Sequence, residues 1–461
     1  MLLSEKEIMI HCVKENNGLF KHISEKVFEN LNSDETPIRF VITHTKNETY
    51  HCELGILSDI NDSLISPDIS IFDFKKRSFE NVEHFNAVLL VPTGIGAEIG
   101  GHAGDATPVA RLMASICDNL ITHPNVVNAS DINEIPENGL YVEGSIICRL
   151  LMGTIGLQPV RSNRVLVVID AHEDETFINA AINSVNGARA SCGFKCQRIV
   201  QLDPPVKMKS IYTSSGRSSG RVEGIENLFN VLNIYKNEYD AVALSSVISV
   251  PLDFHMDYFE SKGFMINPWG GVEALLTHTV SLLYDIPSAH SPMFESQIIA
   301  NMDPGIVDPR MAAEAVSLTF IQCILKGLHR APKIVKDQNA MHNQSVISAE
   351  DISCLVIPDG CIGLPTLAAL EQGIPVIAVK ENRNKMRNDL SAFPWAPGKF
   401  YIVENYWEAA GVMNAIKSGI APESVRRPFN ASIVNIIQKS TLSEKSKKNT
   451  IIDYTVYESS K

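Results

Sequence analysis

The sequence lacks several features that would place it in a specialised class of protein. It has 40 Lys and Arg against 53 Asp and Glu, a formal net charge of −13, and no basic stripe with interleaved aromatic residues. Because an acidic chain repels phosphate backbones, nucleic acid is not expected as a partner. Glycine and proline are not in excess, which excludes collagen-like and low-complexity classes.

Long apolar runs are also missing. No segment approaches the roughly 18 uninterrupted apolar residues that a membrane helix needs. The first 17 residues carry charges within any apolar stretch that a signal peptide would require. The nine cysteines are odd in number and mostly flanked by apolar residues, which is typical of reduced, buried thiols. We therefore expect no membrane contact and a cytoplasmic location.

Familiar catalytic motifs are absent as well. The chain has neither the Gly-Lys-Ser/Thr ending of a nucleotide P-loop nor the Gly-x-Ser-x-Gly elbow of serine hydrolases. His102 with Asp105, and Asp170 with His172, match no known zinc or iron spacing. We therefore expect no bound metal, and the sequence does not identify a cofactor.

The chain does contain the composition of a large globular protein, with 461 residues of which 45% are apolar. Several aliphatic runs without polar alternation predict strands buried on both faces, and they are 87–91, 165–169, 241–244, 355–357 and 375–379. Helical patterns follow several of them, over 106–120, 222–235, 272–283 and 309–325. This alternation predicts an α/β fold with a doubly wound, mainly parallel sheet in two Rossmann-like halves.

The pattern divides the chain into four parts. Residues 1–80 form a small N-terminal α+β extension, with a helix expected over 13–31, a strand over 38–42 and a linker over 66–76. The first α/β half spans 81–210 and the second 211–438. The polar, lysine-rich residues 439–461 are expected to be a mobile tail. The apolar pattern leaves a homo-oligomer open.

A glycine-rich loop follows the first aliphatic run, where the ligands of open parallel sheets bind. Five glycines between Gly94 and Gly104 let backbone N–H groups approach a ligand. The helix predicted from residue 106 would add its positive end, which favours an anion. We predict ligand contacts from the residues Thr93, Gly94, Gly96, Gly100 and Gly101. A tight structural turn is the alternative.

Two further loops are candidates for ligand binding. Residues 212–221 offer hydroxyls and two guanidinium groups, which suit phosphate or carboxylate. The predicted contacts there are Ser215, Gly216, Arg217 and Arg221, and a flexible linker is the alternative. The loop after 355–357 adds Asp359, Gly360 and Gly363.

Titratable side chains near these loops are candidates for acid–base catalysis. The predicted catalytic residues are His102, Asp105, His123, Asp170, His172 and Glu273. Asn125, Asn128 and Trp269 lie beside them in the sequence and are predicted to bind the ligand. The alternatives are that His123 is only hydrogen-bonded and that Glu273 only complements a helix dipole. His290 and Glu295 are further candidates of the same kind.

The segment VPTGIGAEIGGHAGDATPVARLMASICDNLITHPNVVNASDINEIPENGLYVEGS resembles an uncharacterised family found in bacteria and photosynthetic eukaryotes, the domain of unknown function 3326. The likeness extends through RVLVVIDAH, SSGRSSGRVEG, NPWGGVEA and PDGCIGLPTLAALEQGIPVIAVKEN, over residues 85–385. The resemblance implies a shared site but no reaction. The last motif, with Glu371, also resembles the donor-binding half of sugar-nucleotide glycosyltransferases, although their glycine-histidine start is absent.

Three functional hypotheses follow. The first is a cofactor-independent metabolic enzyme that acts on a small anionic metabolite by acid–base chemistry. The second is a glycosyl- or nucleotidyl-group transferase that uses a nucleotide-type donor, based on the C-terminal motif. The third is a non-catalytic metabolite-binding or scaffold protein that uses the same pocket.

Overall fold

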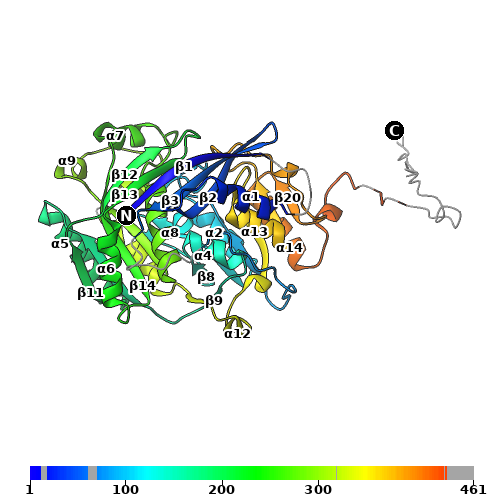
Figure 1. Ribbon diagram of the computed structural model, residues 1–461, viewed down its shortest axis with the longest axis horizontal. Coiled ribbons are helices and arrows are strands. Elements are labelled where there is room, and N and C mark those ends of the chain that lie inside the picture. The colour runs from blue at the N-terminus through cyan, green and yellow to red at the C-terminus, as the bar shows by residue number, and fades with distance from the viewer. Residues whose placement is uncertain (12–17, 61–69, 318, 430, 433, 435–461) are drawn as a thin grey trace. The chain divides into compact units, whose positions relative to one another are not determined.

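The computed structural model describes residues 1–11, 18–60, 70–317, 319–429, 431–432 and 434 (Figure 1). The expected tail, and parts of the expected linker and first helix, lie outside the described residues. Packing contacts divide the chain into two compact units, Met1–Met413 and Asn414–Lys461. The second unit begins within helix α14 (Tyr406–Lys417) and includes a short 3-10 helix, Pro422–Val425.

The larger sheet of the first unit is mixed and has ten strands, in the order β11-β10-β14-β12-β13-β1-β3-β2-β18, with β15 also paired to β14. Its members are β1 (Leu2–His11), β2 (Thr36–Lys46), β3 (Thr49–Ser58), β10 (Arg164–Asp170), β11 (Lys195–Leu202), β12 (Lys207–Tyr212), β13 (Ser218–Glu223), β14 (Ala241–Ser249), β15 (Ser288–Met293) and β18 (Ile362–Gly363). Pairs that involve β10 or β14 are parallel, whereas the pairs from β12–β13 onward are antiparallel.

The smaller sheet has six strands, all parallel, in the order β20-β19-β17-β4-β5-β8. Its members are β4 (Asn86–Leu89), β5 (Asn119–Thr122), β8 (Gly139–Tyr141), β17 (Ile352–Pro358), β19 (Val376–Val379) and β20 (Phe400–Val403). Two short pairs complete the strands, namely β6 (Asn128–Ala129) with β7 (Ile132–Asn133) and β9 (Gly156–Gln158) with β16 (Lys333–Val335).

Helices fill the space around both sheets. They are α1 (Leu19–Glu29), α2 (Thr107–Ala114), α3 (Pro124–Val127), α4 (Gly144–Leu151), α5 (Glu175–Cys192), α6 (Ile225–Tyr235), α7 (Leu252–Glu260), α8 (Gly270–Tyr284), α9 (Gln297–Ala300), α10 (Ala312–Ala315), α11 (Ile321–His329), α12 (Gln338–Met341) and α13 (Leu364–Gln372). Helix α8 packs on β13 and β15, while α4 contacts both α8 and α13. Helix α4 therefore joins the helical layer of the mixed sheet to the helix that precedes β19, in the middle of Figure 1.

All five aliphatic runs form strands, as predicted, and the expected strand over 38–42 lies within β2. The α/β class is confirmed, but the doubly wound arrangement in two Rossmann-like halves is not. The six-stranded sheet takes β4, β5 and β8 from the predicted first half and β17, β19 and β20 from the second. The N-terminal strands pair with β13 and so belong to the mixed sheet.

The expected helix over 309–325 is divided between α10, which ends at Ala315, and α11, which begins at Ile321. Two further local predictions are wrong. The expected helix over 106–120 ends at Ala114, and Asn119–Thr122 instead forms β5, because it finds hydrogen-bonding partners in β4 and β8. The expected loop over 212–221 is mostly the β12–β13 hairpin, whose two strands also pair with β14 and β1. Long-range pairing outweighs local propensity in both places.

Candidate functional site

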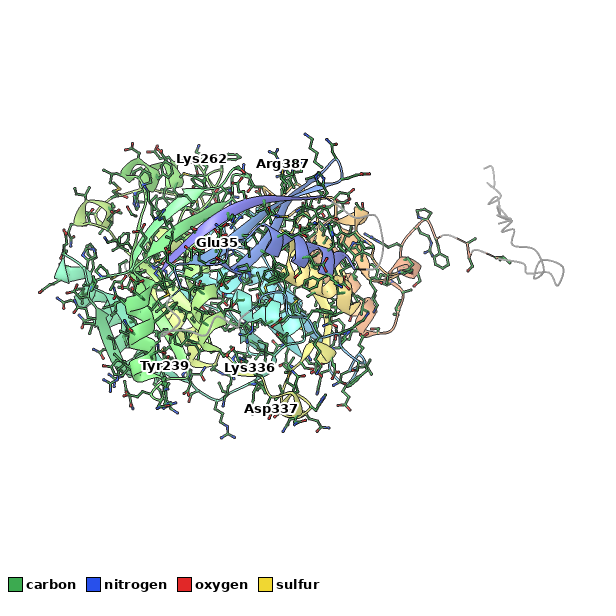
Figure 2. All side chains as sticks on the ribbon, in the orientation of Figure 1. Glu35, Tyr239, Lys262, Lys336, Asp337 and Arg387 are labelled. Atoms are coloured by element: carbon green, nitrogen blue, oxygen red, sulfur yellow. The ribbon has the colours of Figure 1, made fainter. Side chains whose placement is uncertain are left out.

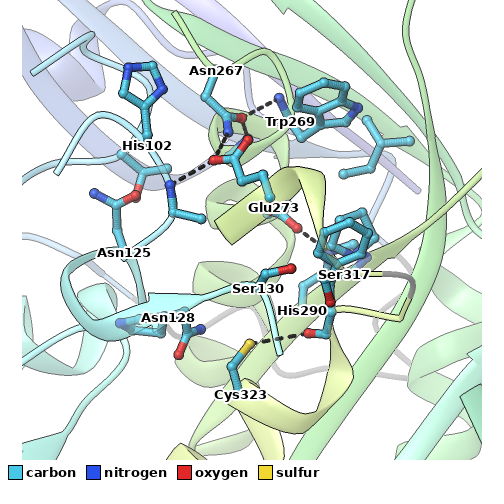
Figure 3. A pocket seen from close by; sticks show the side chains of 18 of the residues that line it. His102, Asn125, Asn128, Ser130, Asn267, Trp269, Glu273, His290, Ser317 and Cys323 are labelled. Atoms are coloured by element: carbon cyan, nitrogen blue, oxygen red, sulfur yellow. Dashed lines mark hydrogen bonds and ion pairs between the residues drawn. The ribbon is translucent and has the colours of Figure 1, made fainter. Parts of the chain in front are cut away.

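A cavity of about 270 Å³ opens among the ends of α4, α7 and α8, the glycine-rich loop, and the segment from β15 to α11. One wall is apolar and includes Met256, Phe259, Phe294, Ile299 and Phe320. The lining also carries titratable side chains, of which Figure 3 labels His102, Glu273 and His290. This combination of an apolar wall and a few convergent polar groups is typical of small-molecule sites.

Glu273 contributes a partly exposed carboxylate to this cavity. It lies in the first turn of α8, where the positive helix end stabilises negative charge. Its Oε1 lies 2.9 Å from Nδ1 of His290, and Nε2 of His290 lies 2.6 Å from the Ser246 hydroxyl. The side chain of His290 is 0% exposed and that of Glu273 is 24% exposed. The contacts thus connect a buried serine, through His290, to an accessible carboxylate. In a serine hydrolase triad, by contrast, the serine is accessible and the carboxylate is buried.

A second carboxylate–imidazole pair has the opposite orientation. Glu143 Oε1 lies 2.5 Å from Nδ1 of His278, with side-chain exposures of 3% and 16% respectively. Glu143 is the N-cap of α4 and accepts a hydrogen bond from the Ser145 amide at 2.8 Å. Burial alone would raise the pKa of Glu143, but His278 and the bonds from Ser145 lower it overall. This pair therefore presents the imidazole, not the carboxylate, to the cavity.

The local sequence explains why these two helix starts can approach each other. Gly144 begins α4, and a Cβ there would lie 2.7 Å from Cε1 of His278, so only glycine leaves room for the imidazole. The start of α8 is held by Asn267, whose Oδ1 accepts hydrogen bonds from the amides of Trp269 and Gly270. The N-terminal ends of both helices consequently lie beside one cavity.

Two histidines from the glycine-rich side also line the cavity and are neutral near pH 7. Burial lowers the pKa of both His102 and His123 to about 4. Nε2 of His123 accepts a hydrogen bond from the Val91 amide at 3.2 Å, which leaves its N–H at Nδ1. Nδ1 of His102 lies 2.7 Å from the Tyr258 hydroxyl. Both imidazoles are suited to hydrogen bonding with a ligand rather than to carrying charge.

Glu314, from α10, adds a carboxyl group that the sequence analysis did not single out. Its Oε1 accepts hydrogen bonds from the Ala103 amide at 2.7 Å and from Nδ2 of Asn267 at 3.3 Å. Burial raises the pKa of Glu314 to about 7, and nearby Asp105 also acts to raise it. Glu314 therefore exchanges its proton near neutral pH.

Ser130 projects a hydroxyl toward the same space. The residue is 5% exposed, and its Oγ has no hydrogen-bond partner among the described residues. Its φ of 61° is left-handed, which is unusual for a residue with a side chain. In Figure 3 this hydroxyl points toward the space between Glu273 and Ser317. Buried polar atoms without partners and strained backbones both concentrate at functional sites.

The charged lining of the cavity is unusual in composition. Four glutamates and five histidines line it, but no Lys or Arg does so within the described part of the chain. In the same part of the chain, no group of three or more His, Cys, Asp or Glu side chains is placed to hold a metal ion. The cavity is therefore a site of carboxylates and imidazoles, without a guanidinium or ammonium group of its own.

The structure brings together nine of the predicted site residues in this cavity. They are Thr93, Gly94, Gly101, His102, His123, Asn125, Asn128, Trp269 and Glu273. The further candidates His290 and Glu295 also line it. The residues that do not line it are Gly96, Gly100, Asp105, Asp170, His172, Ser215, Gly216, Arg217, Arg221, Asp359, Gly360 and Gly363.

Arg217 and Arg221, the guanidinium groups predicted to hold an anion, have partners elsewhere. Arg217 is buried and pairs with Glu53 at 2.7 Å and with Glu5 at 3.0 Å, inside the N-terminal strands. Arg221 pairs with exposed Glu223 at 2.7 Å. Ser215 and Gly216 line a separate open hollow with Lys385 and Arg387, the latter labelled in Figure 2.

The other candidates outside the cavity make local contacts. Asp105 accepts a hydrogen bond from the Gly100 amide at 2.8 Å and so closes the glycine-rich loop. Asp170 accepts one from the Val206 amide at 3.1 Å, and burial raises its pKa to about 8. Nε2 of His172 lies 3.0 Å from the carbonyl oxygen of Phe294, a residue of the cavity wall. Asp359 bonds to the amide of Gly360, and Gly363 precedes α13 as its N-cap.

Comparison with known proteins assigns the chain to a family. The model of a family described as protein of unknown function (DUF3326) matches residues 86–426. The chain belongs to this family. It is 32% identical over 345 residues to an uncharacterized lipoprotein of Synechococcus sp., a match that covers 74% of this chain and 92% of the relative. No solved structure matches the chain.

The relative's name bears on the predicted cytoplasmic location. A lipoprotein is attached to a membrane through a lipid rather than through a spanning helix. Among the described residues, no helix is both long enough and apolar enough to cross a membrane. The cytoplasmic location therefore stays a prediction.

Proposed function

We propose that this protein is an enzyme that moves protons on a small polar metabolite held in the cavity. The observation that carries the proposal is the presence of two glutamate–histidine pairs of opposite orientation at one cavity. The Glu273–His290 pair presents a carboxylate, and the Glu143–His278 pair presents an imidazole. General acid–base catalysis needs a proton acceptor and a proton donor that both reach the substrate.

In this proposal Glu273 is the catalytic base. Its first-turn position on α8 favours the ionised form, and His290 donates a hydrogen bond to it from Nδ1. Ser246 is a positioning residue, because its hydroxyl at Nε2 fixes the tautomer of His290. His278 gives or takes the second proton, with the ionised carboxylate of Glu143 behind it.

The glycosyltransferase-like motif supports this site less well. Asp359, Gly360 and Gly363, which carry that likeness, do not line the cavity. The expected anionic metabolite likewise finds no Lys or Arg among the described lining residues. The cavity therefore favours the acid–base hypothesis over the transferase hypothesis, without favouring an anion as the substrate.

Deuterium exchange tests the proposal even while the natural substrate and product are unidentified. The protein is incubated in D₂O with a panel of small hydroxy, keto and amino compounds, and NMR follows deuterium incorporation and new products. We expect conversion of at least one compound, slowed at least about 100-fold by Glu273→Gln. Glu173→Gln, which makes the same charge change at an exposed residue that does not line the cavity, is the matched control.

Two results would contradict the acid–base assignment. One is conversion that survives Glu273→Gln unchanged. The other is a compound that binds in the cavity without any exchange or product, which would favour the metabolite-binding hypothesis.

A further inference from the structure

No imidazole in the cavity offers a positive charge that is free for an anion. Two of the five face the carboxylates of Glu273 and Glu143. Burial lowers the pKa of His102 and His123 to about 4, and it also lowers the pKa of His255, so these three are mainly uncharged near pH 7. With no Lys or Arg in the described lining, an anionic ligand would meet carboxylates without a compensating cation, which costs binding energy in a partly dry site.

Glu314 is the buried cavity carboxylate whose negative charge is stabilised least by its neighbours. Its described hydrogen-bond donors are neutral, namely the Ala103 amide, Asn267 and the Tyr258 phenol. The groups packed around it include the Tyr258 phenol and Asp105, and Asp105 opposes its ionisation. A nearby cation would therefore stabilise this carboxylate more than it would stabilise Glu273 or Glu143, each of which already contacts an imidazole.

Ser130 provides an independent indication of a ligand. The residue is only 5% exposed, and its hydroxyl is unpartnered among the described residues and directed into the cavity (Figure 3). Neighbouring Asp131 anchors this position, because it accepts hydrogen bonds from Ser317, Thr319 and the Gln322 amide. A buried hydroxyl held in place without a partner loses free energy unless a ligand supplies the bond.

We propose that the cavity binds a small organic amine, with its ammonium group paired to Glu314 and a second polar group bonded to Ser130. This inference rests on the proposed function, since it names the substrate class of the same cavity. The aromatic rings of Trp269 and Phe259 line the cavity as well and provide faces that favour a cation. The apolar wall accommodates the carbon skeleton.

Calorimetric titration with matched ligands tests the sign of the charge. In two series, each charged compound differs from the neutral one in a single substituent: ethanolamine, ethylene glycol and glycolate, and then glucosamine, glucose and glucuronate. We expect the amine of at least one series to bind at least about tenfold more tightly than its neutral counterpart. The carboxylate of each series is expected to bind more weakly than the neutral compound.

Two variants locate the ammonium group and the hydroxyl contact. Glu314→Gln keeps an acceptor for Ala103 and is expected to abolish the preference for the amine over the neutral compound. Glu173→Gln, at an exposed residue that does not line the cavity, is the control and is expected to leave that preference intact. Ser130→Gly is expected to weaken all members of the better series about equally, because it removes a contact that does not depend on the charge.

The outcomes separate this inference from the proposed function. Tighter binding of either carboxylate, equal binding across both series, or no binding of either amine overturns the inference. An amine that binds through Glu314 but undergoes no proton exchange supports the inference while the proposed function fails. If an anionic compound is converted and Glu273→Gln abolishes the conversion, the proposed function is supported and the inference fails.

Discussion

Two polar clusters of this protein use carboxylates in opposite ways. In the N-terminal strands, Glu5 and Glu53 are 4% and 2% exposed and pair with the guanidinium of Arg217, while Arg39 also pairs with Glu5. In the cavity, the carboxylates have imidazoles or neutral donors as partners, and no Lys or Arg in the described lining. The first cluster balances two carboxylates with two guanidinium groups of the same chain, whereas the second leaves room for a cation from outside.

The buried charges of the two clusters serve different purposes, the fold in the N-terminal strands and a proposed ligand in the cavity. Arg217 joins β13 to β1 and β3, so its charge is used to hold strands that lie far apart in sequence. A buried pair of this kind costs most when one partner is removed, because the other charge is left unpaired. A carboxyl such as Glu314, whose pKa is raised by burial, is instead destabilised in its ionised form. A cationic ligand would stabilise that form.

The largest expected effect is on the N-terminal cluster. Arg217→Met leaves buried Glu53 without its guanidinium and Glu5 with that of Arg39 alone, and we expect the free energy of unfolding to fall by about 3–5 kcal/mol. Urea denaturation measures this loss. Arg221→Met, which removes an exposed pair with Glu223, should cost less than about 1 kcal/mol. Similar losses in the two variants would contradict the structural role of the cluster.

Asp170 offers a third case for the comparison. It is a buried carboxyl with a neutral partner, the Val206 amide, and it lies outside the cavity. Burial raises its pKa from 3.8 to about 8, so the folded protein keeps a proton that the unfolded chain releases. Its contribution to stability is present below about pH 4 and is lost as the pH rises toward 8, by up to about 1.4 kcal/mol per pH unit.

Asp170→Asn should remove that loss while keeping an acceptor for the Val206 amide. We expect the free energy of unfolding of the variant to fall less steeply between pH 5 and 8 than that of the wild type. Equilibrium unfolding at several pH values measures both slopes. Glu173→Gln, the same change of charge at an exposed neighbour, is the control, and an equal effect of the two substitutions would argue against a protonated Asp170.

The smallest expected change in stability is at Ser130. Glycine tolerates the left-handed backbone at φ 61°, and Ser130→Gly also removes the unpartnered hydroxyl. We expect the free energy of unfolding to stay constant or to rise by up to about 1 kcal/mol, while ligand affinity falls. Thermal unfolding with and without ligand measures both quantities. A clear loss of stability would show that the Ser130 side chain serves the fold rather than a ligand.

The sequence predicted the strands better than their arrangement. Runs such as 355–357 are recognisable because both faces are buried, and they form β17 and its neighbours as expected. The β12–β13 hairpin could not be recognised from residues 212–221, because Gly is depleted in strands and Ser and Arg are not among the residues enriched there. Its strands are fixed by pairing with β14 and β1, which are distant in sequence.

The sequence also predicted only part of the candidate site, because the rest depends on long-range contacts. The density of glycine after β4 led to His102, the polar segment after β5 led to His123, and the start of α8 led to Glu273. Glu143, Glu314 and Ser130 are single polar residues in ordinary surroundings, and only the fold brings them together. His278 lies five positions after Glu273 on the same helix, but only the glycine at 144 lets it meet Glu143.

The most direct test of the proposed ammonium site is the number of protons released when an amine binds. With a pKa of about 7, Glu314 is about half protonated at that pH, so pairing it with ethanolamine should release up to about 0.5 proton. Titration calorimetry near pH 7, in two buffers with different ionisation enthalpies, measures this number. We predict release from the wild type and none from Glu314→Gln. Binding without proton release, or equal release from both proteins, would contradict the account.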